Sequence, residues 1–318
     1  MKVLITGSSG FLGSWIVRVL SSKHEVVSLV RKTSSLRKLE GIQDIKLIKV
    51  DESQEALAIC DEKPDVLIIN DWWGVGNEFR NDLRQLDNLK RMHAIALAGR
   101  SANVKVVIGV GSQAELGSVE AEIHENSKSN PSTIYGEAKV KSRLLMNQVF
   151  KESDARFVWM RIFSTYGPLD EGSWLIPNIV NSLASDEEIA LTKGEQEWSY
   201  LHAYDLAMAF AAVIESASIN GIVNVGNPET ISIRSAAITI GKILAKEELL
   251  HFGALEYRPD QVMRLQPICE NLTKIGWRPE IAFDDGVKQT IDWLMRKDVS
   301  NLKTREEKFL NFNLPVRL

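Results

Sequence analysis

The sequence has almost no cysteine and no long apolar run. Only Cys60 and Cys269 occur among 318 residues, and neither belongs to a CxxC pair, so a disulfide framework and a metal site are not expected. No apolar stretch approaches the ~20 residues that a membrane-spanning helix needs. The first apolar run, Val3–Ile5, is soon followed by Gly7, too early for a secretory signal. We therefore expect a cytoplasmic protein that does not bind a membrane.

An excess of positive charge is also missing. Lysine and arginine number 38 and aspartate and glutamate 42, which gives a net charge of −4. Proteins that bind nucleic acids usually carry a basic patch, and no pronounced basic run is present here. Hydrophobic residues make up 44% and charged residues 25%, as in ordinary globular proteins. The chain is long enough for about two domains, and nucleic acid is not an expected partner.

Short runs rich in valine, isoleucine and leucine alternate with helical segments in the first half of the chain. Runs without polar alternation indicate strands covered on both faces, as in a parallel sheet. Strands and helices taking turns predict an α/β fold with a doubly wound, Rossmann-type parallel sheet. The expected strands are Val3–Ile5, Val26–Val30, Ile45–Val50, Val66–Ile69, Val104–Ile108, Phe157–Ile162 and Gly221–Val225. The expected helices of this part are Phe11–Leu20, Glu78–Ala102 and Ser132–Lys151.

This alternation weakens after Ile162. The stretch Tyr166–Trp198 contains several prolines and glycines, which predicts loops around one helix, Leu175–Ala184. Further helices are expected at Ser235–Ala245 and Asp284–Met295. We predict a dinucleotide-binding domain formed by residues 1–165 and about 199–230. Residues 166–198 and 231–318 would form a smaller, discontinuous α/β domain for the substrate.

A glycine-rich turn follows the first expected strand. Gly7, Gly10 and Gly13 stand in the run Gly-Ser-Ser-Gly-Phe-Leu-Gly, and an apolar helix follows. A sharp strand-to-helix turn needs residues that tolerate positive φ, and the free N–H groups of the helix N-terminus attract a pyrophosphate. This placement predicts a dinucleotide site with Phe11 and Leu12 beside the glycines. The alternative is a tight turn without a ligand.

The end of the second expected strand indicates which dinucleotide is bound. NAD-binding proteins usually carry an acidic residue there for the ribose 2′-hydroxyl. Here the strand ends at Arg31 and Lys32, and a guanidinium can bind the 2′-phosphate of NADP through two hydrogen bonds. We expect NADP(H), with NAD(H) as the alternative, and Asp51 near the adenine. The alternative for Arg31 and Lys32 is a pair of solvated loop charges.

A serine, a tyrosine and a lysine form a second constellation. Tyr135 and Lys139 are four residues apart in an expected helix and therefore share one face. A nearby ammonium stabilises a phenolate and so lowers the pKa of the tyrosine toward the working range. Ser112 follows the fifth expected strand, where ligands bind in such sheets. We predict all three as catalytic residues, and the alternative is a surface pair of Tyr135 and Lys139.

These motifs together resemble the extended short-chain dehydrogenase/reductase family, in its nucleotide-sugar epimerase, dehydratase and reductase branch. The resemblance spans nearly the whole chain, up to about Met295. Its most specific segments are TGSSGFLG at 6–13, GSQAELG at 111–117, YGEAK at 135–139, RIFSTYGP at 161–168, WSYLHAYDLA at 198–207 and YRPD at 257–260.

The resemblance implies further roles for individual residues. It supports Ser112, Tyr135 and Lys139 as the catalytic residues. It also implies that Asn70, Trp72 and Asn88 lie near the cofactor, and that Arg258 contacts the diphosphate of a nucleotide sugar. A homodimer would form through the helices near Phe79–Gly99 and Ser132–Phe150.

The chain also departs from this family pattern. Dehydratases carry Thr-Asp-Glu where this chain has Ser-Gln-Ala at 112–114, which supplies no acid and base for eliminating water. Trp198 stands where many relatives have a diphosphate-binding arginine, and Ser164 stands where they have an asparagine. Trp72 and Trp73 replace two small residues and either shape the sugar pocket or fill the core. We predict substrate contacts for Gln113, Ser164, Trp198 and Arg258.

The basic end of the second strand favours a reductase over an epimerase. An epimerase recycles its hydride and holds NAD tightly, whereas a reductase consumes NADPH and must exchange it. We expect an NADPH-dependent reductase of a nucleoside diphosphate 4-keto-6-deoxysugar, with hydride delivered to C4 and a proton donated by Tyr135. The alternative is a nucleotide-sugar 4-epimerase with tightly held NAD, and a more remote one is a non-catalytic dinucleotide sensor. The base, the sugar and the stereochemistry at C4 stay open.

Overall fold

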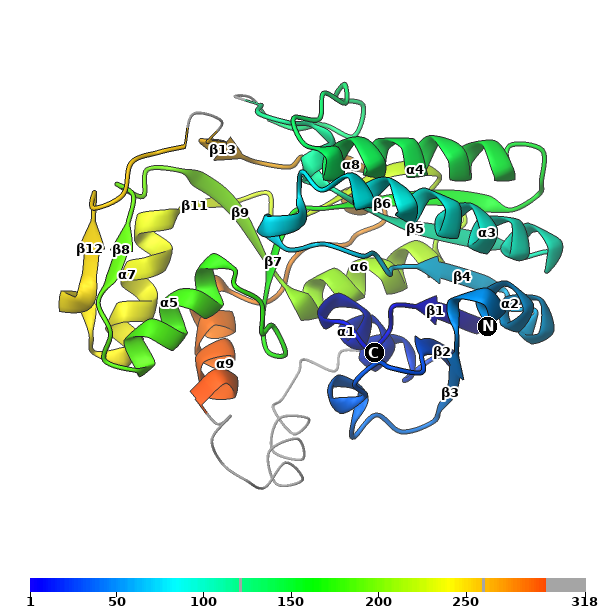
Figure 1. Cartoon of the computed structure of the whole chain (residues 1–318), viewed down its shortest axis with the longest axis horizontal. Coiled ribbons are helices and arrows are strands. Elements are labelled where there is room, and N and C mark those ends of the chain that lie inside the picture. Colours follow the sequence, from blue (N-terminus) through cyan, green and yellow to red (C-terminus); the bar gives the residue numbers. More distant parts are fainter. Residues whose placement is uncertain (120–121, 259–260, 296–318) are drawn as a thin grey trace.

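A seven-stranded parallel sheet forms the centre of the molecule (Figure 1). The computed structural model describes residues 1–119, 122–258 and 261–295. The strand order is β10-β6-β5-β4-β1-β2-β3, and every neighbouring pair is parallel. The strands are β1 (Lys2–Thr6), β2 (Glu25–Arg31), β3 (Ile45–Val50), β4 (Val66–Ile69), β5 (Val106–Ser112), β6 (Arg156–Ile162) and β10 (Gly221–Val225). This arrangement confirms the doubly wound, Rossmann-type α/β fold predicted from the sequence.

Helices cover both faces of this sheet, which explains why its strands are apolar throughout. Successive side chains of a strand point to opposite faces. Val3 and Ile5 of β1 therefore pack in one core with Phe210, whereas Leu4 packs in the other core with Ile95. Helices α1 (Phe11–Leu20) and α6 (Ala203–Glu215) contribute to the first core. Helices α2 (Glu55–Glu62), α3 (Asn88–Ser101) and α4 (Ile134–Phe150) contribute to the second.

Smaller sheets and three further helices lie beyond one end of the main sheet (Figure 1). Strand β9 (Glu197–His202) pairs with three others: β7 (Ser164–Tyr166), β11 (Thr230–Ser232) and β13 (Arg264–Leu265). Strands β8 (Ile189–Leu191) and β12 (Leu250–Phe252) form a separate parallel pair. The helices of this part are α5 (Leu175–Ala184), α7 (Ile233–Leu244) and α9 (Phe283–Met295), whereas α8 (Glu270–Lys274) packs beside β10 of the main sheet.

The structure corrects three expected elements. The stretch 166–198 contains strand β8 and the start of β9 as well as the expected helix α5. A strand of three residues such as β8 leaves little apolar pattern, and only Glu197 and Trp198 of β9 lie in this stretch. Strand β5 begins at Val106 rather than Val104, since Asn103 adopts a left-handed φ of 55° and ends the turn after α3. The helix expected from Glu78 begins only at Asn88.

Hydrogen bonds from side chains to the backbone explain the late start of α3. Residues 77–79 and 83–87 form two short 3-10 turns instead of an α-helix. The Asp82 carboxylate accepts from the backbone N–H of Arg84 at 2.8 Å. The Gln85 amide donates to the backbone oxygens of Gly74 and Phe79 at 2.6 and 3.0 Å. Such bonds compete with helix formation, and they place this connection next to β4 and α4.

The division into two domains stays a prediction, and its last part, 296–318, lies outside the described residues. None of the helices in the described ranges is long and apolar enough to span a membrane. Those same ranges contain no cluster of histidine, cysteine and acidic residues that could hold a metal ion.

Candidate functional site

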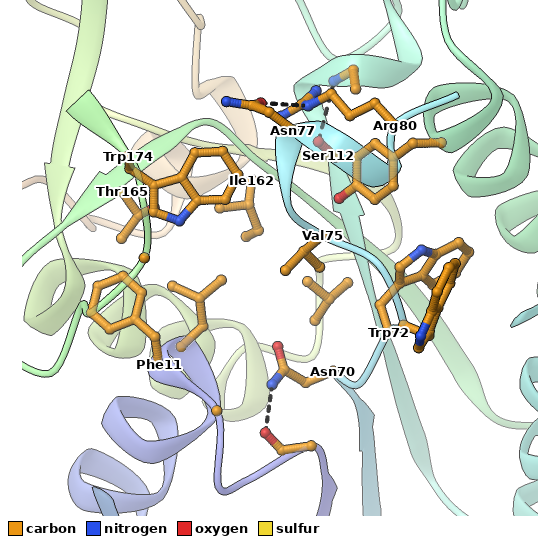
Figure 2. A pocket seen from close by; sticks show the side chains of 18 of the residues that line it. Phe11, Asn70, Trp72, Val75, Asn77, Arg80, Ser112, Ile162, Thr165 and Trp174 are labelled. Atoms are coloured by element: carbon orange, nitrogen blue, oxygen red, sulfur yellow. Dashed lines mark hydrogen bonds between the residues drawn. The ribbon is translucent and has the colours of Figure 1, made fainter. Parts of the chain in front are cut away.

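A cleft of about 1620 Å³ opens at the carboxyl ends of the main-sheet strands. One wall comes from the ends of β1, β2, β4 and β5 and from α4, and the other comes from β7, α5 and β9. Figure 2 shows Phe11 and Trp174 on the side of the cleft opposite Trp72. Parallel α/β sheets bind their ligands in this position.

The glycine turn leaves no room for side chains. Gly7 has a φ of 63°, and a Cβ atom there would lie 2.4 Å from the Cβ of Asp71. A Cβ atom on Gly13 would lie 2.2 Å from the backbone oxygen of Gly7. No side chain caps α1, and its first turn carries no acidic residue. The open N-terminus of α1 therefore fits an anionic group such as a pyrophosphate.

Four of the residues predicted around this turn line the cleft. They are Gly7, Gly10, Phe11 and Leu12, whereas Gly13 packs behind the turn. Asn70, predicted near the cofactor, also lines the cleft, and its side-chain amide donates to the Gly7 backbone oxygen at 3.2 Å. Asn70 therefore holds the glycine turn in place.

Arg31, the last residue of β2, and Lys32, which follows it, face different surroundings. Arg31 lines the cleft, together with Thr33, Ser34, Ser35 and Lys38. Lys32 and Asp51 are exposed and pair with each other at 2.6 Å, outside the residues that line the cleft. Arg31 is therefore placed to meet a ligand directly, and the predicted cofactor contacts of Lys32 and Asp51 stay predictions.

A buried cluster of charges beside the glycine turn was missed by the sequence analysis. Arg91 of α3 forms ion pairs with both Asp71 and Glu55, and all three residues line the cleft. Burial raises the pKa of Asp71 and of Glu55, and the charge of Arg91 opposes both shifts. The only signal in the sequence is that Asp71 directly follows Asn70 at the end of β4.

Ser112, Tyr135 and Lys139 converge in the same cleft. Ser112 is the last residue of β5, and Tyr135 and Lys139 lie in the first turns of α4. The Ser112 side chain lies close enough to Tyr135 to act on the pKa of its hydroxyl. The Lys139 ammonium donates to the backbone oxygen of Val110 at 2.9 Å. The three groups predicted as catalytic therefore share one site, and their roles stay predictions.

Burial dominates the protonation of this group. It raises the pKa of Tyr135, although the neighbouring Ser112 side chain and the charge of Arg80 act in the opposite direction. Burial lowers the pKa of Lys139 to about 7, although the charges of Glu115 and Asp71 favour the ammonium. The expected net lowering of the tyrosine pKa is therefore absent here, because desolvation outweighs the nearby charges.

A fully buried glutamate fixes the position of Ser112. The Glu115 carboxylate accepts from the Ser112 backbone N–H and from the Trp159 indole, both at 2.9 Å. Its other oxygen lies 3.7 Å from the guanidinium of Arg161. The Ser112 hydroxyl accepts in turn from the backbone N–H of Ala114 at 3.2 Å. Glu115 is thus engaged in holding the end of β5.

Trp72 and Trp73 both line the cleft, and Trp72 also packs against the second core. The Lys139 nitrogen lies 3.8 Å from the centre of the Trp72 ring, a cation–π contact. The Trp72 indole donates to the Gln85 side chain at 2.7 Å. Asn88, which also lines the cleft, accepts from the Trp73 backbone N–H at 2.9 Å. These bonds tie the connection after β4 to α3.

All four residues predicted on the substrate line the cleft: Gln113, Ser164, Trp198 and Arg258. The Trp198 indole donates to the Val262 backbone oxygen at 2.9 Å, which holds its ring in place. Arg80, Trp174 and Tyr200 line the cleft as well and were missed. Nothing in the local sequence pattern distinguishes these three from ordinary surface or core residues.

Neither His124 nor His202 lines the cleft. His202 is buried, accepts from the Tyr204 backbone N–H at 3.2 Å, and so caps α6. Burial lowers its pKa to about 4, so it is neutral at pH 7. His124 pairs with Glu270 at 2.9 Å. Both histidines therefore make structural contacts.

A family model described as the NAD dependent epimerase/dehydratase family matches residues 3–226. The chain belongs to this family. Its relatives include dTDP-D-glucose 4,6-dehydratase of Bos taurus, 23% identical, with 96% of this chain and 92% of that one covered. dTDP-4-dehydro-6-deoxyglucose reductase of Escherichia coli is 25% identical, with 59% and 60% covered.

Solved structures of this family share the fold of the chain. UDP-glucose 4-epimerase from Thermotoga maritima, solved with UDP-glucose, matches with a TM-score of 0.84, at 16% identity, over 93% of this chain and 99% of that one. UDP-glucose 4-epimerase from Thermus thermophilus, solved with NAD, matches with a TM-score of 0.83, at 21% identity, over 94% and 100%.

The NAD(P) dinucleotide expected of the family fits the residues present in the cleft. Cβ atoms on Gly7 and Gly13 would collide with Asp71 and with the Gly7 backbone, so only glycine permits the tight turn that brings the start of α1 to the cleft. The free N–H groups of α1 would hold the pyrophosphate, and Asn70 keeps the turn in place.

Proposed function

We propose that the chain is an NADPH-dependent reductase of a nucleoside diphosphate 4-keto-6-deoxysugar. The observation that carries this proposal is the convergence of Ser112, Tyr135 and Lys139 in one cleft with the open N-terminus of α1. A nicotinamide cofactor supplies the hydride in such chemistry. The chain contributes the proton, the orientation of the ketone and the exclusion of water.

Each residue of the constellation has a distinct proposed role. Hydride adds to C4 of the sugar, the π bond of the carbonyl breaks while the C–O single bond stays, and Tyr135 donates its hydroxyl proton to the resulting alkoxide. The Ser112 hydroxyl orients the ketone oxygen. Lys139 supplies positive charge near the Tyr135 phenolate and would hold the nicotinamide ribose. Solvent returns the proton to Tyr135, so each turnover consumes one NADPH and one proton.

Elimination of water finds little support in this cleft. Gln113 and Ala114, which follow Ser112, carry neither an acid nor a base. Glu115 is fully buried and already accepts from the Ser112 N–H and the Trp159 indole. It is therefore not free to exchange protons with a sugar, and we do not propose a 4,6-dehydratase.

Arg31 supports NADPH and thereby a reductase. It lines the cleft beside three hydroxyl residues, Thr33, Ser34 and Ser35, and β2 ends without an acidic residue. A guanidinium with neighbouring hydroxyls suits a phosphate. A 4-epimerase with tightly held NAD is the second candidate, because two 4-epimerases share the fold.

The test is the oxidation of NADPH by a panel of nucleoside diphosphate 4-keto-6-deoxysugars. We expect one NADPH to be consumed for each sugar reduced, and the decrease in NADPH absorbance measures this consumption. Tyr135→Phe should lose the activity. Cofactor absorbance that survives gel filtration, together with isomerisation of a sugar without added NADPH, would show an epimerase. If no sugar of the panel oxidises NADPH, a non-catalytic dinucleotide sensor is favoured.

We also propose that the protein is a cytoplasmic homodimer with two domains divided as the sequence predicts. Helices α3 and α4 pack side by side (Figure 1), and each exposes a leucine, Leu97 and Leu144. Cys60 and Cys269 are both free, as a reducing compartment requires. A mass of twice 35.6 kDa by light scattering would support the dimer, and a monomer would contradict it.

A further inference from the structure

Arg80 lies beside the ring of Tyr135 and has no assigned role. Its guanidinium carbon is 5.4 Å from the centre of that ring, and the Lys139 nitrogen is 5.8 Å from the same point. Figure 2 shows Arg80 on the same side of the cleft as Ser112. Tyr135 thus has two cations at comparable distances, one from α4 and one from the connection that precedes α3.

The side chain of Arg80 is held in this position from both ends. Its backbone oxygen accepts from the Tyr135 N–H at 2.8 Å, and its Nε donates to the Asn77 side chain at 3.0 Å. Within the described ranges no carboxylate forms an ion pair with Arg80. Burial lowers its pKa, and Arg258 repels it, yet a guanidinium stays charged throughout the physiological range. Its charge is therefore fixed and uncompensated by a neighbouring anion.

The charge of Lys139, unlike that of Arg80, depends on pH near neutrality. Burial brings its pKa to about 7, so close to neutral pH the ammonium is only partly populated. Its nitrogen also donates to Val110 and contacts the Trp72 ring. Glu115 and Asp71 favour its charged form, whereas Glu115 also opposes ionisation of Tyr135. A second cation that does not titrate would complement Lys139.

We propose that Arg80 is a positioning residue that stabilises negative charge on the Tyr135 oxygen during proton transfer. The inference rests on the proposed role of Tyr135 as the proton donor. A cation beside an aromatic ring interacts weakly with a neutral phenol and strongly with a phenolate, whose charge extends over the ring. Arg80 therefore makes Tyr135 a stronger acid without contacting the reacting carbon.

The direct test follows the ionisation of Tyr135 and needs no sugar. The five tyrosines are labelled with ¹³C at Cζ, the Tyr135 signal is assigned from its loss in Tyr135→Phe, and the signal is titrated against pH. In Arg80→Gln we expect the titration to move up by about one pH unit or more, a tenfold weaker acid. In Arg80→Lys, which keeps the charge, the Tyr135 titration should stay close to that of the wild type.

Arg84→Gln is the matched control. Arg84 lies in the same connection and stacks on Trp73 at 4.5 Å, but it is exposed and bonded to Asp82. Its loss should leave the Tyr135 titration unchanged. An equal shift in Arg84→Gln would assign the effect to the loop as a whole and overturn the proposal. The proposal also fails if Tyr135 titrates at the same pH in the wild type and in Arg80→Gln. It fails as well if Tyr135 does not titrate in either protein over the pH range in which both stay folded.

Kinetics with any nucleotide sugar that the protein converts give a second readout. Arg80→Gln should lower kcat and move the pH profile to higher pH, with little change in KM. In a Tyr135→Phe background the same change should cost almost nothing, because the phenolate is gone. A loss of nucleotide-sugar affinity with an unchanged Tyr135 titration would mean that Arg80 holds the substrate instead. If no sugar oxidises NADPH, the proposed reductase activity is wrong, but the proposed effect of Arg80 on Tyr135 can still be tested by the tyrosine titration.

Discussion

Arg31 and Lys32 are adjacent in the sequence but meet different surroundings. Arg31 faces the cleft, whereas Lys32 is exposed and bonded to Asp51. Exposed pairs of this kind contribute little free energy, because solvent screens the charges. The two residues offer a matched pair for testing which cation meets the cofactor.

We expect Arg31→Glu to weaken NADPH binding by about tenfold or more and to spare NADH. A carboxylate repels the 2′-phosphate, and a charge-assisted hydrogen bond contributes roughly 1.5–3 kcal/mol. Lys32→Glu should change either affinity by much less. The dissociation constants are measured by nucleotide fluorescence. Equal losses in the two variants would contradict a specific contact at Arg31.

Among the elements, the turn from β1 into α1 depends on close backbone approach. Gly10 donates to the Gly7 backbone oxygen at 3.1 Å, and Gly13 packs against that same oxygen. The helix therefore begins directly behind the turn, and its first N–H groups face the cleft. Stability and ligand binding depend here on the same few atoms.

We expect Gly13→Ala to destabilise the protein by about 1–3 kcal/mol and to weaken dinucleotide binding. The added Cβ would lie 2.2 Å from the Gly7 oxygen, so the turn must shift. Gly10→Ala is the comparison, since its Cβ would lie 3.3 Å from that oxygen. Urea unfolding and dinucleotide titration measure the two effects. A Gly13→Ala protein as stable as Gly10→Ala would refute the steric argument.

Asn88, at the start of α3, ties down the connection that carries Trp72, Trp73 and Arg80. Its side chain bonds the Trp73 backbone at 2.9 and 3.2 Å and the Gln85 backbone oxygen at 3.1 Å. We expect Asn88→Ala to cost about 2 kcal/mol, because buried backbone groups lose their partners. Amide exchange of residues 73–85 should accelerate. Asn220→Ala, an exposed residue with one local bond, should leave those amides unchanged.

On the scale of the whole molecule, buried titratable groups set the response to acid. His202 has a pKa of about 4 in the folded protein and about 6.5 when exposed. Between these values the unfolded chain binds a proton that the folded protein does not. This contribution to stability is present above pH 6.5 and is lost as the pH falls toward 4. Asp205, whose pKa burial raises to about 6, acts in the opposite direction.

We expect the stability advantage of the wild-type protein over His202→Asn to shrink by about 2–3 kcal/mol from pH 7 to pH 4. Only the wild type loses stability because its unfolded chain protonates His202 below pH 6.5. The effect of Asp205 is the same in both proteins and cancels in the difference. Urea unfolding at several pH values gives the difference. A constant difference across this range would show that His202 titrates normally in the folded protein.

Much of the fold and part of the site followed from the sequence alone. Apolar runs such as Val66–Ile69 mark buried strands by local composition, and the glycine spacing at 7–13 and the four-residue interval from Tyr135 to Lys139 are local patterns as well. Such patterns survive in a linear chain because one element contains them. They sufficed to predict the sheet, the turn into α1 and the pair of Tyr135 and Lys139, whereas the family resemblance was needed to place Asn70, Trp72, Asn88 and Arg258 at the cleft.

Only the tertiary structure decided which charges meet. Arg80 reaches Tyr135, Arg91 joins Asp71 to Glu55, and Lys32 turns away to Asp51, although nothing near these residues in the sequence indicates their partners. Protonation states also depend on the tertiary structure, because burial is a property of the packed molecule. Burial raised the pKa of Tyr135, whereas the nearby Lys139 had led us to expect a lowered pKa. Desolvation and Coulomb energy depend on distances between elements, and those distances exist only after the chain has folded.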